Sequence, residues 1–356
     1  MGRKEVDQTK LLEFMHKAIS DIASSSSAIL IILGERLGLY RALSESEYSL
    51  TSNQLAKKTG TVERLVREWL CNQVAGGYVS YDPKSNKYYL SEEQKLALAD
   101  ENSPVYIHGA FKFIKSYFRD EEEFVKMFRN ERKFAWEDHH NCMAEGVAEF
   151  FKPGYVANLL NLWIPSLDRI HEKLLDGAKV ADVGCGFGFT TSLMAKAYPN
   201  STFIGFDSHR ESIEKAKRIT ENQHLKNLSF QVSSAYDFPG HEYDFITFFD
   251  CVHDMGDPIK ALTHAYDSLK KDTKALCMIV EPFATEKLEN NITPVSRTFY
   301  STSTLICVPN SLAFNGPALG AQAGEEKIKE LVLKSGFSKF RRVMDSPVNI
   351  IYEIRP

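Results

Sequence analysis

Apolar positions recur at helical spacing through the first hundred residues and are interrupted by glycines and turn residues. Three helical segments are predicted there from this spacing and its capping residues, at residues 11–43, 50–60 and 62–75. Two short strands follow around a Pro-containing turn, at residues 78–81 and 87–90. Helix, turn, helix and hairpin in this order predict a winged-helix domain.

The remainder of the chain divides into a helical stretch and an alternating one. Residues 101–176 show no strand pattern and are dense in aromatic side chains. From Gly177 onward, short apolar runs alternate with amphipathic helical stretches. The apolar runs predict strands at residues 179–183, 202–206, 228–232, 243–249 and 274–280. The amphipathic stretches predict helices at residues 189–197, 209–222, 258–270 and 325–335.

This alternation predicts the fold class, an α/β fold with a parallel sheet covered by helices on both faces. The chain ends on two further strands, 339–345 and 348–355, joined only by Ser346-Pro347. So tight a connection forces those two strands to run antiparallel. The predicted domains are a winged-helix domain, a helical linker or lid and a cofactor-binding domain, at residues 1–100, 101–176 and 177–356.

Composition argues against several classes of protein. The net charge of −4 gives no global attraction to nucleic acid or to an anionic membrane. The six cysteines form no CxxC pair, so neither a zinc site nor a disulfide framework is predicted, and we expect no metal. The apolar run at residues 28–33 is too short to span a bilayer, and no signal-type segment precedes it. We expect a reduced, cytoplasmic protein.

The stretch after the first strand of the alternating region reads Asp182-x-Gly184-x-Gly186-x-Gly188. A dinucleotide-binding loop would place its third glycine where Phe189 stands, and the Lys-Ser/Thr pair of a phosphate-binding P-loop is missing. The spacing resembles motif I of the class I S-adenosylmethionine-dependent methyltransferases. The resemblance implies S-adenosylmethionine (SAM), which has no phosphates, as cofactor and S-adenosylhomocysteine (SAH) as product.

The same resemblance places the cofactor contacts at the strand ends. Glycines let the backbone approach the ribose and the methionine tail, and free N–H groups of the helix that begins near Gly188 favour the tail carboxylate. Asp182 suits the tail ammonium, and Asp207 suits the two ribose hydroxyls. Ser234-Ala235 stands where the family often has Asp-Ala beside the adenine. The remaining predicted cofactor contacts are Ser208, Ser234, Ala235 and Asp250.

The fourth strand runs into His253-Asp-Met-Gly-Asp257, at the sheet edge where ligands of open α/β folds bind. This segment resembles the HDxxD segment of small-molecule O-methyltransferases, in which the histidine takes the proton of a hydroxyl acceptor. The resemblance implies that His253 is the base and that Glu281, after the fifth strand, orients it. Gln322 stands where the family usually has a second glutamate.

The N-terminal segments 34–43 and 52–60 resemble the dimerisation module of these enzymes, which implies a homodimer. The preferred function is therefore methyl transfer from SAM to a small-molecule acceptor at oxygen, with nitrogen and carbon acceptors left open. Two alternatives fit parts of the sequence, namely a non-catalytic SAM-binding protein and a DNA-binding winged-helix regulator. Arg64 and Arg67 favour the regulator, whereas Glu63 and Glu68 on the same helix oppose it. The long insertion at 281–324 is expected beside the site.

Overall fold

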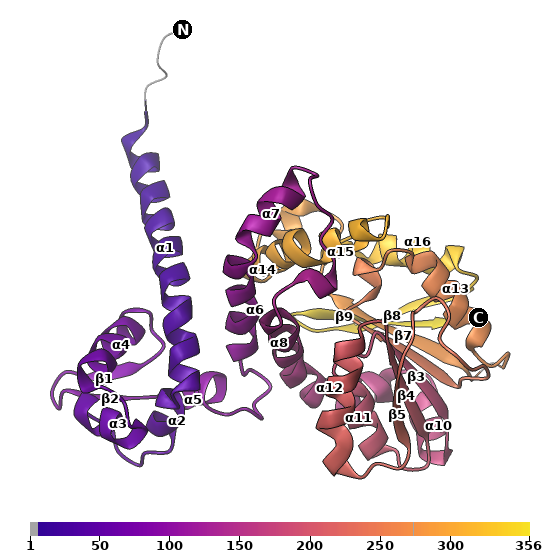
Figure 1. Ribbon diagram of the computed structural model, residues 1–356, viewed down its shortest axis with the longest axis horizontal. Coiled ribbons are helices and arrows are strands. Elements are labelled where there is room, and N and C mark those ends of the chain that lie inside the picture. The colour runs from indigo at the N-terminus through magenta and orange to yellow at the C-terminus, as the bar shows by residue number, and fades with distance from the viewer. Residues whose placement is uncertain (1–5, 273) are drawn as a thin grey trace, which may run out of the picture. The chain divides into compact units, whose positions relative to one another are not determined.

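The computed structural model describes residues 6–272 and 274–356 (Figure 1). The chain divides into two compact units. The first unit comprises the chain up to Ser116 together with Asn141–Pro153, and the second unit comprises Tyr117–His140 and Gly154–Pro356. The helical stretch predicted at residues 101–176 is thus shared between the two units, while the predicted domain boundaries themselves stay a prediction.

The first unit begins with the winged-helix elements that the sequence predicts, followed by α5 (Glu92–Leu98), a helix that the sequence analysis does not predict. In order they are α1 (Gln8–Arg36), α2 (Leu39–Ser44), α3 (Ser52–Thr59), α4 (Glu63–Ala75), β1 (Ser80–Asp82), β2 (Lys87–Tyr89) and α5 (Glu92–Leu98). The single helical segment predicted over residues 11–43 is in fact two helices. Gly38 adopts a left-handed backbone conformation with φ +68°, which ends α1 and caps the start of α2.

Apolar side chains form a stripe along α1. Its members recur alternately every three and four residues and are exposed, with Ser26 as the one polar position; they are Leu12, Met15, Ile19, Ile22, Ser26, Ile29 and Leu33. We call this set the heptad stripe, because this spacing is the seam of a two-stranded coiled coil. Ile31, on the opposite side of the helix, packs into the core of the first unit.

Among the described helices, α1 alone is long and apolar enough to cross a membrane. The whole of α1 is much longer than the apolar run at residues 28–33, from which the sequence predicts no membrane span. A helix whose apolar side packs against another protein surface has the same length and composition as one that crosses a membrane.

The second unit is built on a seven-stranded sheet in the order β5-β4-β3-β6-β7-β9-β8, counted over the described residues. Its strands are β3 (Lys179–Val183), β4 (Thr202–Asp207), β5 (Leu228–Val232), β6 (Phe245–Phe249), β7 (Leu276–Pro282), β8 (Lys339–Asp345) and β9 (Asn349–Arg355). The first five strands run parallel, and β9 lies antiparallel between β7 and β8. The predicted fold class, including the antiparallel last strand, is confirmed.

Helices cover both faces of this sheet, as Figure 1 shows. On one face lie α10 (Ile170–Asp176), α11 (Phe189–Ala197) and α12 (Arg210–Thr220). On the other lie α13 (Pro258–Ser268) and α16 (Glu325–Lys334). The central strands β6, β7 and β9 are buried along their whole length, as expected for strands covered on both faces. The remaining helices of the second unit are α7 (Glu121–Phe128), α9 (Ile164–Ser166), α14 (Pro294–Thr302) and α15 (Val308–Ala313).

Two glycines let α6 (His108–Arg119) and α8 (Cys142–Asn158) approach closely within the first unit. A Cβ on Gly109 would lie 2.3 Å from the backbone nitrogen of Phe150, and a Cβ on Gly146 would lie 2.3 Å from that of Phe113. Each glycine therefore accommodates the backbone of the opposite helix, which cannot move aside as a side-chain tip can.

Substitution of Gly146 by Ala is therefore expected to lower the free energy of unfolding by about 3 kcal/mol or more, because two helix backbones must separate. Denaturant titration followed by circular dichroism measures this loss. The matched control is Gly154→Ala in the same helix, where a Cβ meets nothing within 4 Å. There the higher helix propensity of Ala should leave stability equal or raise it by up to about 1 kcal/mol. Equal losses in both variants would contradict the close-contact explanation.

Candidate active site

The topology brings the predicted site residues to one edge of the sheet. Strands β3, β4, β6 and β7 run parallel, so their carboxyl ends lie at the same edge. At these four ends lie Asp207 and Glu281, within β4 and β7, and the glycine loop 184–188 and the segment 250–257, which follow β3 and β6. The change of strand order beside β3 is where open α/β sheets bind ligands.

The three glycines of the loop are required for different reasons. All three have positive φ angles, and a Cβ on Gly184 would lie 2.8 Å from Sγ of Cys251. A Cβ on Gly188 would lie 2.3 Å from the ring of Phe230. Around Gly186, by contrast, nothing lies within 4 Å of the Cβ position. Gly184 and Gly188 are thus fixed by internal packing, whereas Gly186 borders open space that a ligand can enter.

Asp182 is fully buried at the end of β3. Its carboxylate accepts hydrogen bonds from the hydroxyls of Thr190 at 2.8 Å, Thr191 at 2.6 Å and Thr247 at 3.0 Å. Burial raises the pKa of this carboxyl although the three hydroxyls oppose the rise. The observed role of Asp182 is to tie β3, β6 and the first turn of α11 together; its predicted contact with the methionine ammonium stays a prediction.

Asp207 lies at the end of β4, beside the glycine loop. One carboxylate oxygen accepts the backbone N–H of Gly186 at 2.8 Å, and the other accepts that of His209 at 2.8 Å. A carboxylate oxygen has a second lone-pair direction, so Asp207 keeps capacity for two more donors such as ribose hydroxyls. The other predicted cofactor contacts lie nearby in the sequence: Ser208 directly follows Asp207, and Ser234 and Ala235 follow β5. The Ser234 hydroxyl accepts the backbone N–H of Tyr236 at 3.1 Å. The residues present fit a nucleoside.

His253 and Glu281 form a buried pair. Nδ1 of His253 lies 2.5 Å from Oε2 of Glu281, and Oε1 of Glu281 accepts the backbone N–H of Val252 at 3.0 Å. Burial alone would lower the pKa of His253, but the Glu281 carboxylate raises it well above its ordinary value. Glu281 thus fixes the ring orientation and makes the imidazole a stronger base. The neighbouring Asp254 has its pKa raised to about 7 by burial, although His253 opposes the rise.

The insertion at 281–324 packs against the segment that carries His253, as the sequence predicts. Asn310 and Ser311 donate to the backbone carbonyls of Asp254 at 3.0 Å and Met255 at 2.8 Å. Cys307, a buried thiol in the insertion, is close enough to His253 to help raise the pKa of the imidazole, and burial raises the pKa of the thiol itself. Sequence reasoning missed Cys307, because no motif surrounds it.

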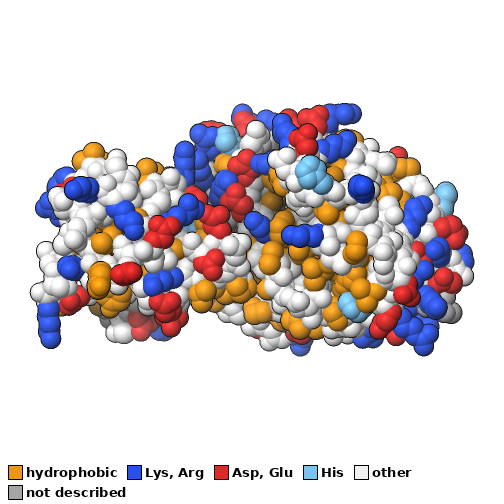
Figure 2. Space-filling view, turned by 90° about the horizontal axis from the view of Figure 1, so that it is seen from below, with side chains coloured by type: hydrophobic (Ala, Val, Ile, Leu, Met, Phe, Trp, Pro, Cys, Tyr) orange, Lys and Arg blue, Asp and Glu red, His pale blue; other side chains and the backbone are white. Residues whose placement is uncertain are grey.

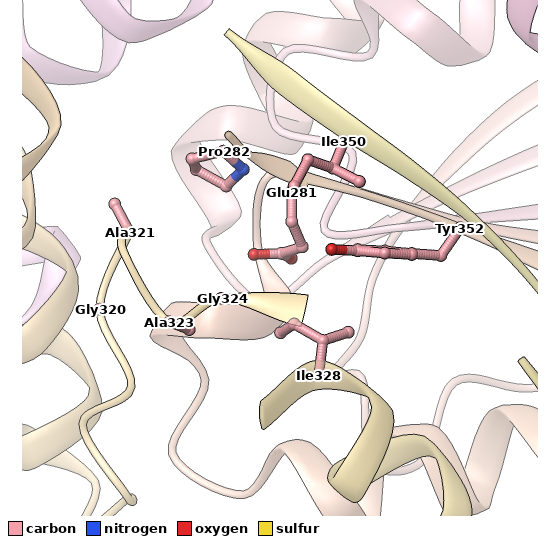
Figure 3. Close-up of a pocket in the computed structure, with 9 residues that line it drawn as sticks. All are labelled: Glu281, Pro282, Gly320, Ala321, Ala323, Gly324, Ile328, Ile350 and Tyr352. Carbon is pink, nitrogen blue, oxygen red and sulfur yellow. The ribbon is translucent and has the colours of Figure 1, made fainter. Parts of the chain in front are cut away.

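A small pocket beside Glu281 is lined by residues of β7, β9, α16 and the turn before α16 (Figure 3). In Figure 3 the Glu281 carboxylate and the Tyr352 hydroxyl point toward one another across it. Gln322, where the family usually has a second glutamate, donates instead to the carbonyl of Phe283 at 3.0 Å. Its buried Oε1 makes no hydrogen bond among the described residues. Glu281 is therefore the carboxylate that orients His253.

Asp250, predicted as a cofactor contact, has two partners that the sequence did not indicate. Its Oδ2 accepts the hydroxyl of Tyr155 at 2.6 Å, and its Oδ1 accepts the side-chain amide of Asn349 at 2.8 Å. Asp250 directly follows β6 and is partly exposed. It directly precedes Cys251, whose Sγ lies against Gly184 of the glycine loop, and His253 and Glu281 are the charged groups near its carboxyl.

The candidate recognition helix of the winged-helix domain does not offer free cations. On α4, Arg64 pairs with Glu68 and Arg67 pairs with Glu63 at 2.6 Å, each pair one helical turn apart. On the face that Figure 2 shows, Lys and Arg side chains are interspersed with Asp and Glu. Neither observation provides the basic face that DNA binding requires.

Within the described ranges, no group of three His, Cys, Asp or Glu side chains could hold a metal ion. His139, next to His140 in the sequence, pairs with Asp120 through Nδ1 at 3.2 Å. The aromatic residues of 101–176 largely pack on one another in edge-to-face pairs rather than forming one surface. Such pairs are Phe113–Phe150, Phe124–Phe134 and Tyr155–Trp163.

Comparisons with known proteins identify the two kinds of domain. Residues 174–326 match a family described as a methyltransferase domain, and residues 25–99 match an Rv2258c-like winged helix-turn-helix domain. A ubiquinone biosynthesis O-methyltransferase of Actinobacillus pleuropneumoniae is 30% identical over 131 residues, which are 34% of this chain and 53% of that protein. The chain thus spans about half the length of the curated relatives it matches.

Solved structures of the same fold match over the whole chain. Human N-acetylserotonin methyltransferase in complex with SAM has a TM-score of 0.69 at 16% identity, covering 100% of this chain and 99% of that one. An O-methyltransferase family protein of Burkholderia thailandensis has a TM-score of 0.67 at 14% identity, covering 99% of both chains. Identities this low establish the fold alone.

The different surroundings of the loop glycines give a paired expectation. Gly188→Ala should lower the free energy of unfolding by about 3 kcal/mol, because the new Cβ overlaps the Phe230 ring as well as straining the backbone. Gly186→Ala should cost only the backbone strain, about 1 kcal/mol, and weaken SAH binding by roughly tenfold, because its methyl enters open space beside Asp207. Denaturant titration and isothermal calorimetry measure the two effects. If Gly186→Ala binds SAH as tightly as the parent protein does, Gly186 does not belong to the ligand site.

Proposed function

We propose that this chain, a class I methyltransferase with an N-terminal winged-helix domain, transfers a methyl group from SAM to a hydroxyl of a small-molecule acceptor. The observation that carries the proposal is the buried His253–Glu281 pair at the sheet edge that also holds the glycine loop. This arrangement supports a donor site and a base that act beside each other.

Residues at the ends of β3 and β4 would hold the donor. Gly186 gives it close access to the backbone, Asp207 accepts from the ribose hydroxyls, and the N-terminus of α11 faces the methionine carboxylate. SAM supplies a methyl group on a positively charged sulfur, a good leaving group. The neighbours solved with SAM or SAH support this choice of cofactor.

His253 would take the proton of the acceptor. As the acceptor oxygen forms its bond to the methyl carbon, its proton passes to the imidazole, the carbon–sulfur bond breaks, and Glu281 stabilises the resulting imidazolium. We expect the acceptor to approach the imidazole from the side of the insertion, which carries the neighbouring thiol of Cys307.

Replacement of His253 by Ala is expected to leave SAH affinity nearly unchanged and to lower turnover on a hydroxyl acceptor by roughly 10²-fold or more. Glu281→Gln keeps the imidazole but removes the negative charge that raises its pKa. Because the base has to be neutral, the rising limb of the parent's rate against pH should follow the raised pKa of His253 and should move to lower pH in Glu281→Gln.

Transfer of labelled methyl groups from SAM to a panel of phenols and other small hydroxyl compounds measures these rates. Unchanged turnover in His253→Ala would refute the base assignment, and an unmoved pH limb in Glu281→Gln would refute the role of the carboxylate. If the parent binds SAM yet methylates no acceptor, the alternative of a non-catalytic SAM-binding protein is favoured.

The heptad stripe of α1 supports a second proposal, that two copies of the chain associate through this helix. Six of its seven positions are exposed apolar side chains at coiled-coil spacing. Exposed apolar area of this extent is unfavourable in water, and a second copy offers an identical seam with which it can interdigitate. The winged-helix match, which includes the last part of α1, is consistent with a dimerisation module.

The double substitution Ile19→Asp and Ile22→Asp is expected to convert a dimer into a monomer, because like charges then face each other across the seam. Size-exclusion chromatography with light scattering reports the mass. Ser24→Asp, an exposed change on the opposite side of α1, is the control and should remain dimeric. A parent protein that is monomeric at micromolar concentration and sediments with lipid vesicles would instead assign α1 to a membrane surface.

A further inference from the structure

Asp250 has an unusual backbone conformation for a residue at a strand end. Its φ is +51°, in the left-handed region that residues other than glycine rarely adopt, and its N–H donates to the carbonyl of Val280 at 2.8 Å. This bend ends β6 while the N–H of Asp250 still bonds to β7. Strain held at a ligand-binding edge of a sheet is a pointer to function.

The carboxyl group of Asp250 is held by uncharged donors. The Tyr155 hydroxyl at 2.6 Å and the Asn349 amide at 2.8 Å occupy one oxygen each. Tyr155 is itself buried, with its ring packed edge-to-face against Trp163 and Phe249 at centroid distances of 5.9 and 5.4 Å. Aromatic surroundings of this kind strengthen any charge interaction of the carboxylate.

No Lys or Arg in the described chain forms an ion pair with Asp250. The charged groups that face it are Glu281, which disfavours ionisation, and His253, which favours it; Tyr155 is the other titratable neighbour. Burial is the largest influence and raises the pKa of Asp250 to about 8. The carboxyl groups of Asp250, Asp254 and Glu281 thus surround one imidazole, and a further positive charge would be stabilised there.

The position of Asp250 indicates where that charge comes from. Cys251 contacts the glycine loop at Gly184, and His253 lies two residues further along the chain. The methyl group to be transferred has to lie between the donor loop and the base, because it reaches the acceptor there. A SAM bound in this way would bring its sulfonium near Asp250, which directly precedes Cys251 and is influenced by the charge of His253, whereas SAH would bring a neutral sulfur there.

We propose, resting on the proposed function, that the Asp250 carboxylate supplies the negative charge opposite the sulfonium. Asp250, Tyr155 and Asn349 thereby distinguish the cationic donor from its neutral product. Burial raises the pKa of Asp250 to about 8 and so favours its protonated form in the free protein at neutral pH. Binding of a cation releases that proton to solvent, and formation of the neutral product favours its return. Product then binds less tightly than donor.

The sign of the pH dependence follows. The ionised form of Asp250 binds the cation better, so SAM affinity should rise as pH increases from 6.5 to 9 through the pKa of Asp250. SAH has no sulfonium, so the ratio of the SAH to the SAM dissociation constant should rise over the same interval. Both ligands share the ribose, the adenine and the methionine tail, so the ratio of their dissociation constants isolates the sulfonium charge.

The experiment is calorimetry of SAM, SAH and sinefungin, a stable analogue with an ammonium in place of the sulfonium. Titration of the parent protein in two buffers of different ionisation enthalpy gives the number of protons released on ligand binding. We expect a proton to be released on binding of SAM and of sinefungin but not on binding of SAH. In Asp250→Asn the preference for SAM over SAH should fall by at least about tenfold, the equivalent of one pKa unit. Asp345→Asn, an exposed carboxyl on β8 paired with Arg342, is the charge-matched control and should keep the preference.

The outcomes are distinguishable. Equal preference for SAM in parent and Asp250→Asn, with no proton release on the parent, overturns the inference and leaves the proposed function intact, because both ligands still bind. A parent that binds neither SAM nor SAH overturns both. The buffer comparison uses the unmodified chain, so it decides the question even if Asp250→Asn folds poorly. In addition, Tyr155→Phe removes a hydrogen-bond donor to the carboxylate, and this should move the midpoint of the pH dependence of SAM binding to higher pH.

Discussion

The carboxylate of Glu281 is the interaction on which the arrangement of the site depends. One oxygen holds the imidazole of His253 and the other holds the backbone N–H of Val252, so a single side chain fixes both the ring and the turn that carries it. The end of β7 is thereby joined to the segment after β6. That segment in turn contacts the glycine loop through Cys251, which places base and donor loop in one continuous framework.

Much of this framework is predictable from local sequence. The alternation of apolar runs and amphipathic stretches predicts strands β3 to β9 within a few residues, and the short turn at Ser346-Pro347 predicts the antiparallel last strand. Strand topology then brings Asp207, His253 and Glu281 to one edge, because the carboxyl ends of parallel strands share it. Periodicity could not predict the break at Gly38, since the residues on both sides of it continue the helical pattern.

The partners of the site residues were not predictable in the same way. Tyr155 and Asn349 lie 95 and 99 positions from Asp250, and neither belongs to a motif. Cys307 reaches His253 from an insertion whose conformation depends on tertiary packing. The glycine loop shows the same limit, because its spacing indicates a ligand, yet two of its glycines are explained by Cys251 and Phe230. Asp182 likewise binds three hydroxyls of its own chain.

Ser26 is the single polar member of the heptad stripe. A buried hydroxyl needs a hydrogen-bonding partner, and in a parallel seam the unshifted alignment sets the two Ser26 side chains opposite each other. A slip of seven residues would instead place each hydroxyl against an apolar side chain at position 19 or 33. One small polar residue in an otherwise apolar stripe would thus set the register, because it selects which of several equally apolar pairings the two chains adopt.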